Sequence, residues 1–431
     1  MQRPQLAELI KRMDANSVAI IPGAREVTRS NDTSYRYRQN SDFYYLTGFN
    51  EPEAIAVIAP AKEEKYTLFV RPRDPEKEIW DGYRAGVEGA RTSYGADAAY
   101  PIEEFQTKLG DLLSGAKTIY YRLGAGNTEL DARVINEIAR LRTLGRKGVS
   151  APHSIVDAGV LLHEMRLIKT DVEIEIMQRA ADIAVEAHIE AMKNTRPGMN
   201  EYEIEALVEY VFRKNGALAP AYTTIVGGGA NATILHYVNN DAPLHDGDLL
   251  LLDAGAEYKG YASDITRTFP VDGRFTEAQR DIYDLVLETE IACVKRARAG
   301  ISLEELKTYS IELLTEGMVR LGLLQGDVKK LIEEEKYKQF YMHGLGHYLG
   351  MDVHDVGLYR MDDEPRKLEP GMIITVEPGL YVSPHAENVP EKYLGIGVRI
   401  EDNILITEDG NRNLTIKVPK QAEEIEELMA R

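Results

Sequence analysis

Four acidic residues in the C-terminal half of the chain lie within or at the end of apolar, strand-like runs. Asp253 ends LLLLD, Asp264 lies in SDITRTF, Glu377 in MIITVEPG and Glu401 in GVRIEDNILI. A carboxylate in such a run is costly to bury unless it is paired or bound to a cation. His347 lies in a glycine-rich segment, HGLGHYLGMDVHD. Metal binding explains all four acids together, so we interpret these five residues as one dinuclear metal site.

The spacing of the first two acids predicts how they meet. If residues 257–260 (EYKG) form a hairpin loop, Asp253 lies directly opposite Asp264 on the neighbouring strand. Two opposed carboxylates destabilise a sheet, and a bridging divalent cation reverses that effect. The alternative is a surface hairpin with two solvated acids. LLLLD disfavours it, because the run is apolar on both faces of a strand.

The second pair of acids repeats the pattern of the first. Gly247 precedes Asp253 by six positions, and Gly371 precedes Glu377 by six. Each of these acids is followed within two positions by another glycine, and then by a second acid-bearing apolar run. The repetition predicts two structurally similar halves, each of which donates two carboxylates to a shared site.

Several histidines flank the acids, but we expect only one of them to be a ligand. The glycines at 344 and 346 place His343 and His347 in a loop rather than on one face of a helix. His354 follows in the same segment, and His236 precedes the first acid pair. Four carboxylates and one imidazole form an oxygen-dominated site that suits two divalent ions such as Mn²⁺. The remaining histidines are interpreted as surface or satisfied groups: His153, His163, His188, His245 and His385.

Arg399 precedes Glu401 by two positions, so both side chains point to the same face of a strand. A cation beside a ligand carboxylate keeps it ionised and oriented. The alternative, a surface ion pair, is disfavoured because the surrounding VRI is apolar.

Length and composition limit the class of protein. The chain has 431 residues, a formal net charge of −19 and one cysteine, Cys293. The charge disfavours binding to a nucleic-acid backbone as the main role, and a single cysteine excludes an intrachain disulfide. No apolar run approaches the length of a membrane span, and the N-terminal MQRPQLAELIKRMDANS lacks the apolar core of a signal peptide. We therefore expect a cytoplasmic protein without membrane partners.

The order of strand-like and helical stretches predicts two domains. Residues 1–165 alternate between the two types, as in SVAIIPG, KYTLFVRP and EEFQTKLGDLLSG, and are predicted to form an α/β domain. A long periodic helix begins after Thr170 or Asp171, either of which is a suitable N-cap, and residues 166–431 form the second domain. Its predicted elements are a helix over 172–194, a helix over 201–215, strands within 222–273, helices near 276–298 and 302–322, strands within 371–418, and a solvated helix at the C-terminus.

These residues resemble the ligand set of the pita-bread metallopeptidases, which include methionine aminopeptidase, Xaa-Pro aminopeptidase (aminopeptidase P) and prolidase. The resemblance rests on the five ligands together with HGLGHYLGMDVHD, TVEPGLY and VRIEDN. Near the N-terminus, YRYRQNSDFYYLTGFNEPEA and EIWDGYRAG look like the additional N-terminal domain of aminopeptidase P and prolidase, which methionine aminopeptidase lacks. The resemblance is closest to bacterial aminopeptidase P. It implies an α/β N-terminal domain followed by an α+β pita-bread catalytic domain.

The resemblance also implies an activity. The expected reaction releases the N-terminal residue from peptides with proline in second position, through attack by a metal-bridging hydroxide. Glu377 would accept the proton of the nucleophile, and His354 and His236 would stabilise the tetrahedral intermediate and orient the substrate. His343 would line the proline side, and Tyr222 is assigned to substrate binding.

The resemblance further implies a homodimer or homotetramer in which one subunit closes the site of another. Trp80 and Asp32 are the candidates for that contact. Trp80 has an alternative interpretation, as a filler of the core of its own domain. Asp32 has one as a turn residue.

Three other functions are alternatives to an aminopeptidase P activity. Prolidase shares the ligands and the N-terminal domain but cleaves only Xaa-Pro dipeptides, and we identify no group that would bind the free carboxylate of proline. Creatinase shares the fold but lacks the full ligand set. A non-catalytic binding module on the same fold is disfavoured by the intact ligands and by His354.

Overall fold

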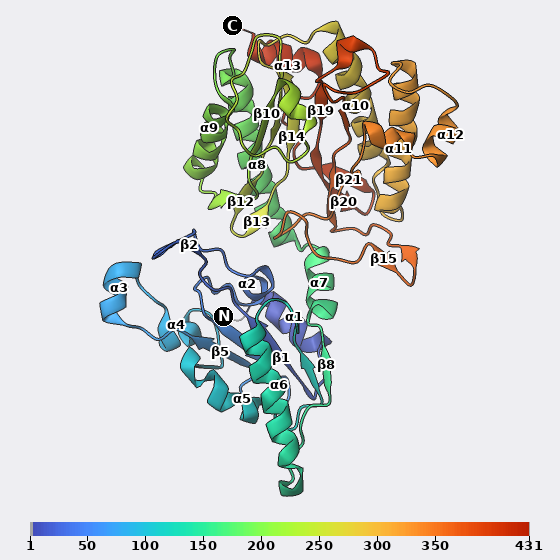
Figure 1. Ribbon diagram of the computed structural model, residues 1–431. Coiled ribbons are helices and arrows are strands. Elements are labelled where there is room, and N and C mark those ends of the chain that lie inside the picture. The colour runs from blue at the N-terminus through green and yellow to red at the C-terminus, as the bar shows by residue number, and fades with distance from the viewer. Residues whose placement is uncertain (1–2, 431) are drawn as a thin grey trace. The chain divides into compact units, whose positions relative to one another are not determined.

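The computed structural model describes residues 3–430, which divide into two compact units at Met165 and Arg166 (Figure 1). Each unit has its own hydrophobic core. Within the described residues, no helix is both long and apolar enough to cross a membrane.

The N-terminal unit is built on a six-stranded mixed sheet with the strand order β6-β5-β4-β1-β7-β8. Strand β4 runs antiparallel to both of its neighbours, while β1, β7 and β8 are mutually parallel, as are β5 and β6. The strands are β1 (Ser17–Pro22), β4 (Ile55–Ile58), β5 (Tyr66–Val70), β6 (Ala98–Pro101), β7 (Thr118–Tyr120) and β8 (Ser154–Val156). The predicted α/β organisation is confirmed.

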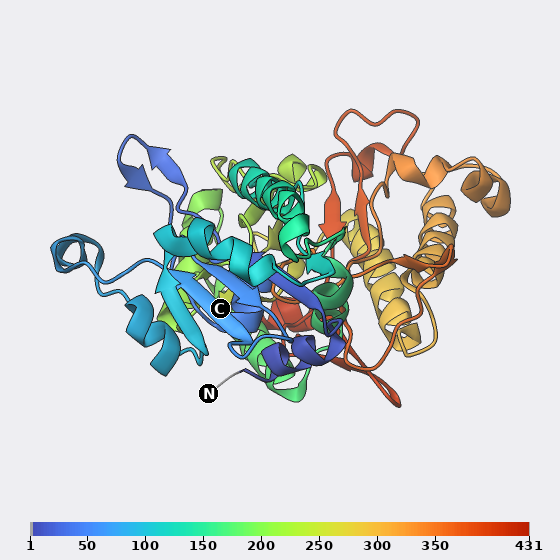
Figure 2. The same ribbon diagram turned by 90° about the horizontal axis from the view of Figure 1, so that it is seen from below.

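Helices cover this sheet, and two short segments extend away from it. The helices are α1 (Pro4–Arg12), α2 (Ser41–Thr47), α3 (Pro75–Asp81), α4 (Gly86–Thr92), α5 (Phe105–Leu113), α6 (Thr128–Thr143) and α7 (Gly159–Leu167). The α3 segment and a small hairpin, β2 (Thr28–Ser30) and β3 (Thr33–Ser34), project from the body of the unit in both views (Figure 1 and Figure 2). No residue of α3 is buried as a whole.

The C-terminal unit contains two long two-stranded ribbons flanked by helices. Figure 1 shows α8 (Asp171–Asn194) and α9 (Glu201–Lys214) on one side of the strands and α10 (Glu277–Arg296) and α11 (Leu303–Arg320) on the other. Each of these four helices begins with a capping box, in which the N-cap side chain and the residue three positions later bond each other's backbone. Thr170 is the cap of α8, as predicted.

The two ribbons have the same construction. In the first ribbon, β11 (Leu249–Asp253) and β12 (Ala256–Tyr258) pair with β14 (Thr266–Pro270) and β13 (Tyr261–Ala262). In the second ribbon, β17 (Ile373–Val376) and β18 (Gly379–Tyr381) pair with β20 (Asp402–Thr407) and β19 (Gly397–Arg399). This arrangement supports the two similar halves that the sequence predicts.

The remaining elements complete the sheets and cover the ribbons. Strand β10 (Ile225–Gly228) extends the first ribbon and β21 (Gly410–Asn413) the second. The others are β9 (Ala219–Pro220), α12 (Val328–Glu333), β15 (Arg360–Met361), β16 (Glu364–Pro365), α13 (Ala422–Met429) and the 3₁₀ turns Gly229–Thr233, Lys336–Gln339 and Glu391–Tyr393. The C-terminal α13 is amphipathic rather than fully solvated, because Ala422, Ile425 and Met429 are buried.

Candidate metal centre

The four acids are carried by the two ribbons. Asp253 is the last residue of β11, Asp264 precedes β14, Glu377 follows β17, and Glu401 lies between β19 and β20. Asp253, Asp264 and Glu401 are buried, with 8%, 5% and 1% of their surface exposed. All five residues of β11 are buried, so the alternative of a solvated surface hairpin is wrong.

The predicted direct opposition of Asp253 and Asp264 is wrong by two residues. The hairpin loop is Lys259–Gly260 rather than 257–260, and Asp253 pairs with Thr266. Lys259 and Gly260 both have positive φ, 51° and 81°, which is the geometry of the two-residue loops that match the twist of their strands. Because the shift is an even number of residues, Asp264 remains on the same face as Asp253, as a diagonal neighbour.

In the second ribbon the acids are opposed. Val376 pairs with Asp402 and Gly379 with Arg399, and this register places Glu377 opposite Glu401. Gly379 leaves room for the Tyr381 hydroxyl, because a Cβ at position 379 would lie 2.5 Å from that oxygen. The two ribbons therefore present their acid pairs differently, although their strand pairing is alike.

The structure brings the five predicted ligands together. Ligand atoms of Asp264, His347 and Glu401 all lie within 4.8 Å of one another. His347 Nε2 lies 3.4 Å from Asp264 Oδ2 and 3.4 Å from Glu377 Oε1. The hydroxyl of Tyr222 joins the first pair, since it lies 2.5 Å from both Asp253 Oδ1 and Asp264 Oδ1.

Two observations show that these residues fit a divalent metal. His347 Nδ1 lies 3.0 Å from the carbonyl oxygen of Tyr348, which only accepts, so Nδ1 carries a proton and Nε2, which faces the acids, is the nitrogen that would bind a metal ion. Glu401 Oε2 accepts a hydrogen bond of 2.7 Å from Thr266, whereas its buried Oε1 has no hydrogen-bond partner among the described residues. A buried carboxylate oxygen without a partner is costly, and a cation would satisfy it.

The side chains of the site strongly perturb one another. Burial raises the pKa of Glu377 to about 7, and the charges of Asp264 and Asp253 add to the effect. Burial and the neighbouring acids raise the pKa of Glu401 well above its usual value. Burial lowers the pKa of His347, but the hydrogen bond and charge of Asp264 outweigh it and raise the value to about 9. Positive charge is therefore strongly favoured between these atoms.

Arg399 supplies one fixed positive charge. It is 3% exposed and its Nη2 donates to Asp253 Oδ2 at 2.6 Å, so the alternative of a surface ion pair is wrong. The carboxylate that it contacts is Asp253 rather than Glu401, beside which the sequence placed it. Its Nε donates to Thr266 Oγ1, the group that bonds Glu401. Its Nη1 donates to the hydroxyl of Tyr381 at 2.9 Å.

This chain of hydrogen bonds ends at His343. Its Nδ1 lies 2.7 Å from the Gly344 carbonyl and its Nε2 2.9 Å from the Tyr381 hydroxyl. Burial and the charge of Arg399 lower the pKa of His343 to about 4, so the ring is neutral at physiological pH. Both ring nitrogens are thus engaged by protein groups, and the ring face is what remains for contact.

His354 and His236 lie near the acids but are not part of the group of converging ligand atoms. The ring of His354 packs edge-on against His347, with centroids 4.3 Å apart. Burial lowers the pKa of His354, and the imidazoles of His347 and His236 lower it further. Both His354 and His236 are exposed side chains.

Sequence reasoning missed several residues that hold the site. Asn403 bonds both backbone groups of Asp264. Thr266 donates to Glu401, and Thr375 donates to Glu377. Tyr381 accepts from Arg399. The period-two alternation of a strand was the available signal, because residues 399, 401 and 403 share one face, as do 264 and 266.

The other histidines stay outside the site, with one correction. His188 is fully buried and is not a surface group. Its Nε2 lies 3.1 Å from the carbonyl oxygen of Ala254, next to Asp253, while Nδ1 has no hydrogen-bond partner within residues 3–430. Burial lowers its pKa to about 4, so it supports the strand as a neutral ring.

Trp80 and Asp32 belong to the N-terminal unit, where both are exposed. Trp80 lies on α3 and is 86% exposed, so the alternative that it fills the core of its own domain is wrong. Ile79 and Tyr83 beside it are 81% and 91% exposed. Asp32 lies at the tip of the β2–β3 hairpin, which agrees with its interpretation as a turn residue.

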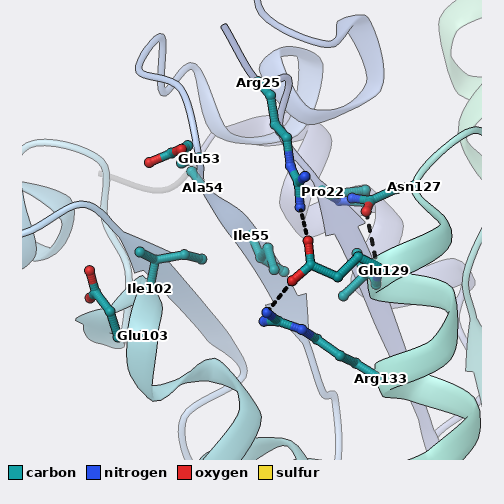
Figure 3. A pocket seen from close by; sticks show the side chains of 12 residues that line it. Pro22, Arg25, Glu53, Ala54, Ile55, Ile102, Glu103, Asn127, Glu129 and Arg133 are labelled. Carbon is teal, nitrogen blue, oxygen red and sulfur yellow. Dashed lines mark hydrogen bonds and ion pairs between the residues drawn. The ribbon is translucent and has the colours of Figure 1, made fainter.

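The N-terminal unit also contains a cavity of about 360 Å³, lined partly by Ile55, Ile102 and Leu130 (Figure 3). One wall carries Glu129, whose carboxylate accepts from both Arg25 and Arg133. None of the residues predicted for the active site lines it. Its lining residues all belong to the N-terminal unit.

Comparison with known proteins agrees with this geometry. Residues 175–408 match the metallopeptidase family M24, and residues 3–120 match the aminopeptidase P N-terminal domain. The chain belongs to metallopeptidase family M24. It is 49% identical over 423 residues to the Xaa-Pro aminopeptidase of Escherichia coli, which covers 98% of this chain and 95% of that protein.

Two solved structures match along nearly the whole chain. The Pseudomonas aeruginosa aminopeptidase PepP has a TM-score of 0.97 and 50% identity, with 99% of this chain and 96% of that chain covered. Zinc-substituted E. coli aminopeptidase P in complex with product has a TM-score of 0.95 and 48% identity, with the same shares covered. The predicted α/β N-terminal domain and pita-bread catalytic domain are confirmed. The predicted activity, that of a metal-dependent Xaa-Pro aminopeptidase, is confirmed as well.

Proposed function

We propose that the protein removes the N-terminal residue from peptides with proline in second position, using two divalent metal ions held by Asp253, Asp264, His347, Glu377 and Glu401. The observation that carries this proposal is the convergence of these five side chains from two separate ribbons and one loop. Four carboxylates and one imidazole favour Mn²⁺ over zinc.

Bound metals supply Lewis-acid polarisation of the scissile carbonyl and a water-derived nucleophile at neutral pH. The residues of the chain provide the remaining functions. Glu377 accepts the proton of the nucleophile, the role that the family resemblance implies for it. His354 and His236, exposed beside the acids, donate hydrogen bonds to the developing negative charge. Arg399 keeps Asp253 ionised and oriented through its 2.6 Å ion pair.

Recognition of proline is assigned to His343, with Tyr222 at the acid pair. An X-Pro bond has no amide N–H, so a site for it needs shape rather than a hydrogen-bond acceptor. The neutral His343 ring fits that need because both of its nitrogens are already bonded within the protein. The Tyr222 hydroxyl bonds Asp253 and Asp264, and we also assign Tyr222 to substrate binding.

We further propose that residues 1–165 and 166–431 act as separate domains of a homodimer or homotetramer. Trp80 and Asp32 would contact the site of a second copy. The support is exposure: Ile79, Trp80 and Tyr83 are three large apolar or aromatic side chains exposed on one short projecting segment, and exposed apolar surface of this kind can mark a protein contact. Association of copies would bury it.

The decisive experiment is hydrolysis of an Xaa-Pro-Xaa tripeptide series after chelation, with Mn²⁺ or Zn²⁺ added back. We expect cleavage before proline in tripeptides and longer peptides, with Mn²⁺ the better activator. An Xaa-Ala-Xaa series is the control for proline specificity. Cleavage confined to Xaa-Pro dipeptides would identify a prolidase instead, and metal-free protein with full activity would refute the metal mechanism.

A further inference from the structure

The segment that connects His347 to His354 has little regular secondary structure. It forms one isolated bridge to β17, between Tyr348 and Ile374. Its two ends are brought together because the backbone N–H of Asp355 donates to the Tyr348 carbonyl at 2.9 Å. The fold of this segment therefore sets the distance between the two imidazoles.

The two histidines are fixed by different means. His347 is held directly by β17, because its N–H donates to Thr375 Oγ1, its carbonyl accepts from the Thr375 N–H, and its Nδ1 bonds Tyr348. The His354 ring packs against the His347 ring. Among the described residues, none forms a hydrogen bond with the His354 ring. Its position must therefore come from its backbone neighbours.

The neighbour of His354 is Asp355, which points the opposite way into a buried group of charges. Its side chain is 1% exposed, and its two oxygens accept from Arg166 Nη2 at 2.6 Å and from Lys169 Nζ at 3.1 Å. The same Arg166 nitrogen donates to Asp352 Oδ2 at 2.7 Å. We call Arg166, Lys169, Asp352 and Asp355 the anchor cluster.

The surrounding backbone is shaped to admit this cluster. Gly350 lies so close that a Cβ there would be 2.0 Å from Asp355 Oδ2. The Lys169 ammonium also donates to the Leu167 carbonyl, and its own N–H bonds Gly371 at the start of the second ribbon. The cluster thus ties the histidine segment to the end of α7, to Lys169 between α7 and α8, and to the strand that precedes Glu377.

Buried ion pairs of this kind are not an efficient source of stability. Removing several charges from water costs about as much as their attraction returns, and well-packed apolar residues often serve a fold equally well. A buried ion pair does impose a defined geometry, because each charge must keep its partner. The position of this cluster, one residue from His354, indicates what that geometry serves.

We propose that the anchor cluster positions His354 for transition-state stabilisation, so that Arg166, Lys169 and Asp355 are positioning residues of the reaction. This inference rests on the proposed function, in which His354 donates to the developing charge. The cluster acts through the backbone of one residue, so a small displacement suffices. A shift of about 1 Å in a catalytic group costs on the order of 10²-fold in rate.

The test is a double-mutant cycle between Lys169→Met and His354→Ala in the full-length, metal-loaded protein. Lys169→Met leaves the Arg166–Asp355 pair intact, which limits damage to the fold. Lys392→Met is the matched control, because it removes an exposed lysine that lies 2.8 Å from Asp281 in the same unit. Metal content, kcat and KM are measured for each protein on one Xaa-Pro-Xaa peptide.

In the protein with His354 intact, we expect Lys169→Met to lower kcat by about tenfold or more and to leave KM and metal content unchanged. In the His354→Ala background the same substitution should leave kcat unaltered. Additive losses in the two backgrounds, or loss of metal in Lys169→Met, overturn the proposal. If Lys169→Met does not fold, Arg166→Lys, which keeps the charge and loses the fork geometry, takes its place with the same expectations.

The cycle separates this inference from the proposed function. A His354→Ala protein with low kcat beside an unaffected Lys169→Met protein refutes the anchor and leaves the function intact. Wild-type kcat in His354→Ala refutes the role assigned to His354, and the anchor with it.

Discussion

Asn403 should control metal affinity although it is not a ligand. Its Oδ1 accepts from the Asp264 N–H at 3.1 Å and its Nδ2 donates to the Asp264 carbonyl, so one side chain satisfies both backbone groups of a ligand residue. The two residues belong to different ribbons, and Asn403 is 1% exposed. Asn403→Ala removes the connection and leaves both Asp264 backbone groups buried without a partner.

The expected loss of stability follows from those two groups. An unsatisfied buried donor or acceptor costs about 1–3 kcal/mol, so Asn403→Ala should lower the free energy of unfolding by about 2–6 kcal/mol. Metal affinity should fall by about 10–100-fold, the usual range when a group that orients a ligand is removed. Asp264 keeps its carboxylate, so the loss would reflect position rather than ligand number.

Asn411→Ala provides the matched control. Its Nδ2 donates two hydrogen bonds of 2.7 Å to the carbonyls of Val294 and Ala297, at the end of α10 and away from the acids. Chemical denaturation and calorimetric titration with Mn²⁺ should show reduced stability in both variants, and weaker metal binding in Asn403→Ala alone. Equal metal affinities in the two proteins would refute the role of Asn403 in placing Asp264.

Four further outcomes are expected. Exhaustive chelation should abolish activity and lower the unfolding temperature, and Mn²⁺ should restore both, because metal ligation relieves repulsion among the buried acids; elemental analysis and thermal scans check this. Glu401→Ala should lose metal and turnover together, and a loaded, active variant would contradict its assignment as a ligand. His354→Ala should keep its metal while kcat falls on the order of 10²-fold, whereas His347→Ala should lose metal, as metal analysis beside kinetics will show. Trp80→Ala should leave the metal site loaded, weaken kcat/KM for a pentapeptide more than for a dipeptide, and loosen the oligomer in sedimentation; equal ratios with unchanged sedimentation would oppose the contact.

The sequence predicts that the four acids and His347 converge, because burying a carboxylate needs a reason. Each acid lies in an apolar run, and a run of this kind indicates its own burial. The structure places all four acids together with His347. The paired spacing of Gly247 and Gly371 also reflects a shared backbone need, since both adopt positive φ, 82° and 90°, just before the first strand of each ribbon.

The register of the first ribbon could not be read from the same pattern. The residues EYKG look like a four-residue loop, but Glu257 and Tyr258 remain in the strand and the loop is Lys259–Gly260. A lysine at positive φ is uncommon, so local preference predicted the wrong turn, and pairing along the whole ribbon decided the register. Hydrogen bonds such as Asn403 to Asp264 depend on that register and were invisible for the same reason.

Strand alternation also explains why charged residues occupy both faces of the same ribbons. Glu401 faces the metal centre, whereas the next residue, Asp402, faces a buried group formed with Arg267 and Lys420 at 2.7 and 2.6 Å. Arg267 also donates to the carbonyl oxygen of Glu401 at 2.6 Å, so the rear group fixes the backbone from which the ligand extends. Arg267 forms no ion pair with the ligand acids, because the five hydrogen bonds of its guanidinium go to Asp402 and to backbone carbonyls. On the face that carries the ligand acids, Arg399 is the one arginine among residues 3–430 that forms an ion pair with a ligand acid. Most of the negative charge of the four carboxylates is therefore left for metal ions to balance.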